Sequence, residues 1–86
     1  MEDIYIIVEN GNPYPIAYKT YKSAVNSVKE KHREYLKEQI KQLEYFYEIE
    51  ILLADINVPE NTITGISKLY IEKGINIEIH KLHIIN

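Results

Sequence analysis

Residues 16–56, IAYKTYKSAVNSVKEKHREYLKEQIKQLEYFYEIEILLADI, decide the fold, because this stretch of 41 residues contains neither glycine nor proline. Its apolar side chains recur at steps of three and four residues, an average of about 3.6, which is the period of a straight α-helix. The resulting stripe consists of Val25, Val28, His32, Leu36, Ile40, Leu43, Tyr47, Ile51 and Ala54. We therefore predict one long helix that follows an N-cap at Thr20 and stops before Asn57 and Pro59.

Such a helix is too long for the rest of the chain to cover. About 34 residues at 1.5 Å each span roughly 50 Å, whereas a compact domain of this size is about 30 Å across. The second half of the helix is apolar on nearly all sides, and a helix of that kind is buried on all sides. We expect this half, together with one face of the sheet, to form the interface of a homodimer, with Tyr45, Phe46, Ile49, Leu52 and Leu53 on the helix. An alternative is that residues 48–53 leave the helix and form a strand.

The residues before the helix predict a β-hairpin. Residues 4–8 are apolar on both faces, which favours a strand inside a sheet, and Asn10-Gly11 supplies a tight turn. Residues 14–18 return as an edge strand, because Pro13 and Pro15 lack the N–H donors that a central strand needs.

The residues after the helix predict a second hairpin, with strands at residues 66–72 and 75–85 and a turn at Lys73-Gly74. The parity of the apolar residues changes near His80-Lys81, which indicates either a β-bulge or the end of the buried face. The expected fold is a single α+β domain over residues 1–86: ββαββ, with an N-terminal β-hairpin, one long central α-helix and a C-terminal β-hairpin, forming a dimer.

Composition restricts the function classes. The chain has no cysteine, so it offers no thiolate metal site, and no apolar run approaches the length of a membrane span. The net charge of −3 is unevenly distributed, because residues 19–41 carry seven Lys/Arg against three Glu. We expect a cytoplasmic protein, or one inside the host cell if the chain is viral, since its richness in Ile, Lys, Tyr and Asn is typical of AT-rich genomes.

Catalytic patterns are missing from the sequence. It contains no nucleophile elbow, no phosphate-binding glycine-rich loop and no zinc-protease motif. His80 and His83 are three residues apart, which places them on opposite faces of a regular strand. His32 lies on the helix stripe, where a partly buried or interface histidine is the expected role rather than a general base. We therefore predict a protein that is not an enzyme and has no cofactor and no metal.

The residues that point to a partner are tyrosines and lysines. Tyrosine offers a large rigid contact area with a polar tip, which interfaces favour. We predict a non-enzymatic protein–protein interaction module that contacts a protein partner through Tyr14, Tyr18, Tyr21, Lys29, Arg33 and Lys37. In general character such a small, acidic, cysteine-free chain is similar to phage or viral accessory proteins that bind and inhibit a host factor.

Two alternatives stay open. In the first, the three tyrosines and a cation such as Lys22 or Arg33 line a pocket that binds or sequesters a small nucleotide-like anion. In the second, the tyrosines and the basic helix face bind single-stranded nucleic acid. The acidic net charge and the glutamates between the lysines argue against the second alternative.

Overall fold

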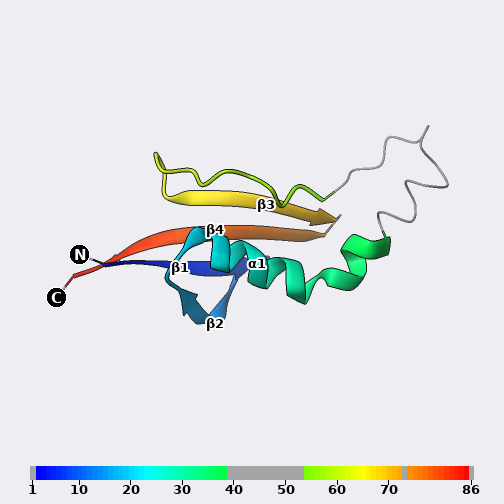
Figure 1. Cartoon of the computed structure of the whole chain (residues 1–86), viewed down its shortest axis with the longest axis horizontal. Coiled ribbons are helices and arrows are strands. Elements are labelled where there is room, and N and C mark those ends of the chain that lie inside the picture. The colour runs from blue at the N-terminus through cyan, green and yellow to red at the C-terminus, as the bar shows by residue number, and fades with distance from the viewer. Residues whose placement is uncertain (1, 39–53, 73, 86) are drawn as a thin grey trace.

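The structure, a computed structural model, describes residues 2–38, 54–72 and 74–85. The regular elements follow one another as β1 (Glu2–Glu9), β2 (Asn12–Tyr18), α1 (Tyr21–Lys31), β3 (Ile66–Glu72) and β4 (Ile75–Ile84). The four strands form one antiparallel sheet in the order β2-β1-β4-β3 (Figure 1). An α+β domain with a ββαββ arrangement is therefore confirmed.

The first hairpin forms because its turn and its prolines lie where a hairpin tolerates them. Asn10 and Gly11 both adopt positive φ, at 49° and 83°, as a tight reversal requires. β2 is the edge strand and β1 lies inside the sheet, as the prolines and the two apolar faces predict. The pairing of β1 with β2 shifts register between Ile6 and Val8. The regular alternation of inward and outward side chains is therefore interrupted within β2, and Ile16 is 57% exposed.

The second hairpin turns at Gly74, whose φ of 89° lies in the left-handed region. β4 pairs with β1 without a shift, from Ile84 opposite Glu2 to Ile77 opposite Glu9. The predicted bulge near His80 is therefore wrong. The alternative, that the buried face ends there, holds, because the next positions of β4 that point to the α1 side are Lys81 and His83 instead of apolar residues.

The long helix is not confirmed as one continuous element. Thr20 is the N-cap, as predicted, and its hydroxyl accepts from the N–H of Ser23 at 3.0 Å. α1 then ends at Lys31, because His32 leaves helical geometry at φ −104° and ψ 22°, and residues 33–38 are helical again. Residues 54–58 are extended instead of helical, and Asp55 forms a β-bridge with Tyr70.

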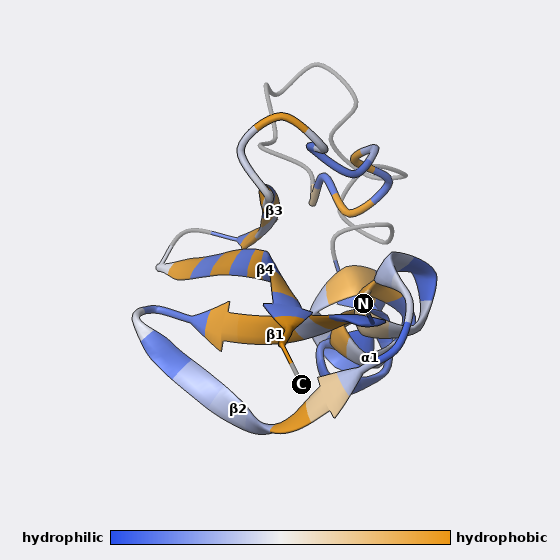
Figure 2. Ribbon diagram, turned by 90° about the vertical axis from the view of Figure 1, so that its left-hand side faces the viewer, coloured by the Kyte–Doolittle hydropathy of each residue, from blue (hydrophilic) through white to orange (hydrophobic). Residues whose placement is uncertain are grey.

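The core lies between α1 and one face of the sheet (Figure 2). Small side chains of α1 allow the helix to approach the sheet closely, where the inward residues of three strands meet them. The buried set is Tyr5, Ile7, Ala24, Val25, Val28, Leu69, Ile71, Ile77 and Ile79. The segment 54–65 runs along the outer edge of β3 in Figure 1 and adds Ile56 and Val58 to the periphery of this core.

Candidate functional site

The face of the sheet opposite α1 is the largest feature that the fold leaves without a covering layer among the described residues. Strand register fixes which side chains point there, because Ile6 lies opposite His80 on β4 and His80 lies opposite Ile66 on β3. None of these side chains belongs to the core, whose members have the other parity. We call this surface the open face, and its apolar members are Ile4, Ile6, Val8, Ile66, Leu82 and Ile84.

The apolar character of the open face is unusual for a water-facing side of an antiparallel sheet, where polar residues normally alternate with the core residues. Figure 2 shows this difference between strands: β1 is hydrophobic along most of its length, whereas β4 alternates. Leu82 is 46% exposed at this surface. The half of the open face near the hairpin turns is polar instead, with Lys68 opposite Glu78, and a hollow of about 240 Å³ lies between them and Val8.

A second cluster lies where α1 ends. Oε1 of Glu9 accepts a hydrogen bond from the hydroxyl of Tyr14 at 2.8 Å and one from Nε2 of His32 at 2.7 Å. The ammonium of Lys31 lies 3.5 Å from the same oxygen and 4.3 Å from the centre of the Tyr14 ring. Glu9 thus connects β1 with β2 and with the break in the helix. These contacts fix the position of His32, from which residues 33–38 continue.

The electrostatics of this cluster suit a structural clamp. Burial acts to raise the pKa of Glu9, but the hydrogen bonds from Tyr14 and His32 outweigh it and hold that pKa below its ordinary value. Burial and the Glu9 carboxylate raise the pKa of Tyr14, so its phenol keeps its proton. His32 is 5% exposed and its Nε2 is engaged, so the predicted partly buried histidine is found.

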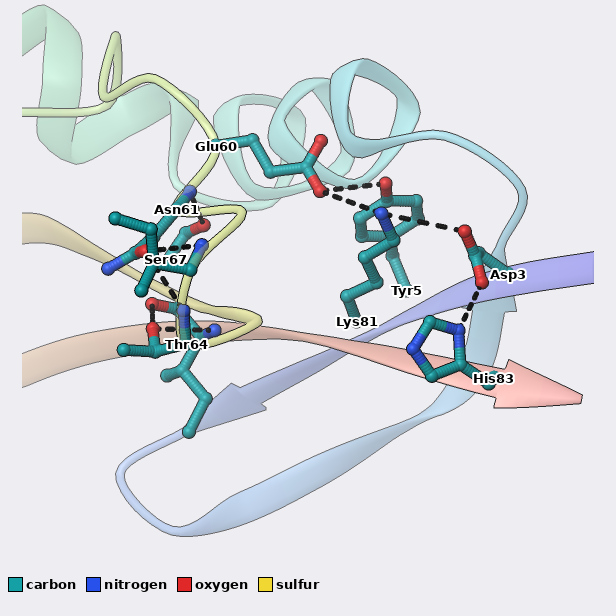
Figure 3. A network of polar contacts seen from close by, with 10 residues as sticks. Asp3, Tyr5, Glu60, Asn61, Thr64, Ser67, Lys81 and His83 are labelled. Carbon is teal, nitrogen blue, oxygen red and sulfur yellow. Dashed lines mark hydrogen bonds and ion pairs between the residues drawn. The ribbon is translucent and has the colours of Figure 1, made fainter.

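A third cluster ties the loop before β3 to the ends of β1 and β4 (Figure 3). The Tyr5 hydroxyl donates to Glu60 at 2.9 Å, while the Lys81 ammonium lies 3.7 Å from Glu60 and 3.5 Å from Asp3. His83 donates to Asp3, and this hydrogen bond lowers the pKa of that carboxyl. The cations and anions alternate, so the charges of this cluster are matched within the chain.

The same loop is ordered by its own hydrogen bonds. The Asn61 side chain accepts from the backbone N–H groups of Ile63 and Thr64, and the backbone N–H of Asn61 donates to the buried hydroxyl of Ser67 at 2.9 Å. The loop therefore presents Ile63, which is 95% exposed, from a fixed turn.

The three tyrosines predicted to meet a partner have hydroxyls that bind within the chain. Tyr14 donates to Glu9, Tyr18 shares a hydrogen bond with Ser27 at 2.6 Å, and Tyr21 donates to the carbonyl of Val58 at 2.6 Å. All three pack against the edge of the core. Among the described hollows, the one beside α1 includes Tyr21, but none collects all three rings around one pocket.

The predicted basic residues lie along and beyond α1. Lys29 contacts Asn57 at 3.4 Å, and Arg33 pairs with Glu30 at 3.4 Å, as the i, i+3 spacing predicts. Lys37 is exposed. The predicted dimer-interface residues, namely Tyr45, Phe46, Ile49, Leu52 and Leu53, lie outside the described residues.

The sequence reasoning missed Glu9, and it expected one face of the sheet in the dimer contact without identifying which face. Two features of the sequence were available as signals. Glu9 is a charged residue at a strand position that points to the same side as Tyr5 and Ile7, and a histidine, His32, lies on the apolar stripe of the helix. The open face was signalled by Ile4, Ile6 and Val8, but its extent depends on the pairing of β1 with β4, which links the two ends of the chain.

Comparisons with known proteins add no relative. Neither the protein-family models, nor the curated proteins, nor the solved structures gave a significant match to this chain. In the described parts of the chain, no helix has the length and hydrophobicity to cross a bilayer, and no three acidic or histidine side chains are arranged to hold a metal ion.

Proposed function

We propose that this chain is a non-enzymatic protein–protein interaction module that self-associates through its open face. The observation that carries the proposal is the row of apolar side chains on β1, β4 and β3 that points away from α1. Apolar surface of this kind stabilises an assembly when a second apolar surface removes it from water.

The size of the open face supports a contact between two copies. Eight residues of β1 at about 3.3 Å each give a length of roughly 26 Å, and four strands about 4.8 Å apart give a width of roughly 19 Å. The whole sheet face then measures about 500 Å² per copy, so two copies together can bury at most about 1,000 Å², which is near the lower limit for specific interfaces. This size favours a dimer that exchanges with monomer in the micromolar range.

The polar clusters support a role without catalysis. Glu9 and His32 bind each other, and Asp3 and His83 bind each other, so these acid–base pairs stabilise the fold. The second part of the proposal is that the dimer binds another protein through the basic side of α1. In this role it would act as a phage or viral type of accessory protein that binds and inhibits a host factor.

Light scattering after size-exclusion chromatography tests the proposed contact with two matched variants. Leu82→Glu places a charge on the open face, whereas Ile63→Glu makes the same kind of change at a loop tip that is 95% exposed. We expect the wild type and Ile63→Glu to elute as dimers at about 100 μM and Leu82→Glu to elute as a folded monomer. Equal masses for the two variants would argue against the open face as the contact.

A further inference from the structure

A groove lies between α1 and the segment 56–59, and a lysine at its rim, Lys22, has no ion-pair partner among the described residues. Its volume is about 330 Å³, and its floor consists of Val25, Ile56 and Val58, which belong to the core or its periphery. Two contacts join its walls: the Tyr21 hydroxyl donates to Val58, and Lys29 contacts Asn57. The groove is therefore formed before any partner arrives, which reduces the entropic cost of binding.

Polar side chains at regular spacing line the helical wall of this groove. Lys22, Asn26 and Lys29 follow one another at i, i+4 and i+7, so they lie on one side of α1. At 1.5 Å per residue, the two lysines are about 10.5 Å apart along the helix axis. In the described part of the chain Lys22 has no ion-pair partner, and Glu60 near the opposite wall is bound by Tyr5 and Lys81.

We infer that this groove binds an extended acidic peptide segment with two carboxylates three residues apart. In a polyproline II conformation each residue advances about 3.1 Å and every third side chain points to the same side, so two such carboxylates are about 9.3 Å apart. That spacing fits the two lysines, while a β-strand places side chains three apart on opposite sides. The amide of Asn26 supplies a donor and an acceptor for the peptide backbone.

The charge distribution of the chain favours the same ligand. The nine residues that line the groove include two lysines and no carboxylate. An acidic segment is therefore attracted before it docks. This inference rests on the proposed function, because it names the partner chemistry of a protein-binding module.

Fluorescence anisotropy tests the inference with labelled peptides of alanine and proline that carry two glutamates one, two, three or four residues apart, and with a glutamine version. We expect the peptide with glutamates three residues apart to bind most tightly and the glutamine version to bind about fivefold to tenfold more weakly. The double substitution Lys22→Gln/Lys29→Gln should weaken binding by about fivefold to tenfold. The control is Lys19→Gln, which removes an exposed lysine outside the groove and should change the affinity less than about twofold.

Three results would overturn the inference. The first is an equal loss of affinity in the groove and control variants, which would indicate non-specific charge attraction. The second is equal binding of the glutamine peptide. The third is tighter binding of a labelled oligothymidine that depends on Lys22 and Lys29, which would make the groove a nucleic-acid site. The variant Leu82→Glu separates this inference from the proposed dimer, because it should become monomeric and still bind the peptide.

Discussion

Replacing Glu9 by glutamine should destabilise the protein more than removal of any exposed carboxylate, because Oε1 of Glu9 is the common acceptor for Tyr14 and His32. A hydrogen bond to a charged group contributes about 1.5–3 kcal/mol, and glutamine keeps an acceptor oxygen while it loses the charge. We therefore expect Glu9→Gln to lower the free energy of unfolding by about 1–2 kcal/mol. An 86-residue domain has roughly 4–13 kcal/mol in total, so the loss is easily measured.

The contribution of Glu9 should depend on pH in a defined direction. Its pKa in the folded protein is below the ordinary value of 4.5, so its stabilising effect is complete above that value and is lost as the pH falls through the folded pKa. The difference between the wild type and Glu9→Gln should be largest near pH 7 and should shrink as the pH falls below 4.5.

Urea denaturation followed by circular dichroism measures both effects. The matched control is Glu30→Gln, which also removes one negative charge but from a side chain that is 74% exposed and pairs with Arg33. This control should cost less than about 0.5 kcal/mol. If Glu9→Gln costs no more than Glu30→Gln, or if its cost is the same at pH 3 and pH 7, the reasoning about the clamp is refuted.

Three further substitutions test the fold. Ile7→Ala should lower the free energy of unfolding by about 3–4 kcal/mol, because Ile7 is completely buried; a loss below about 1 kcal/mol in urea would contradict its place in the core. Thr20→Ala should cost about 1 kcal/mol, because the hydroxyl no longer accepts from Ser23, and Thr20→Ser should restore most of the loss in the same assay. Gly65→Ala should lower the free energy of unfolding by about 1 kcal/mol, because φ at this residue is 75°, which strains an alanine backbone. The added Cβ itself fits, at 3.7 Å from the Lys81 carbonyl oxygen, so an unchanged thermal midpoint would exclude backbone strain there.

The strands were predictable from sequence because local chemistry determines them. Asn10-Gly11 and Gly74 adopt the positive φ angles that their turns require. The strands predicted at residues 66–72 and 75–85 match β3 and β4 closely, whereas β1 and β2 each begin two residues before the predicted starts at residues 4 and 14. Thr20 is the N-cap for the same local reason.

The helix break and the open face were not predictable in this way, because both depend on contacts between distant residues. Helical periodicity continues through His32 in the sequence, yet His32 donates to Glu9, which is 23 residues away, and the helix is interrupted there. The pairing of β1 with β4 likewise joins Ile4 to Leu82 across almost the whole chain. Periodicity reports which face of an element is apolar but not which other element covers that face.

Sedimentation equilibrium across a wide range of protein concentration tests the proposed self-association most directly. The monomer mass is 10.2 kDa. The wild type should rise toward twice this mass with a dissociation constant on the order of 1–100 μM, and Leu82→Glu should stay at the monomer mass throughout. A wild type that remains at 10.2 kDa at every concentration, or a Leu82→Glu variant that associates as strongly as the wild type, would contradict the proposed role of the open face.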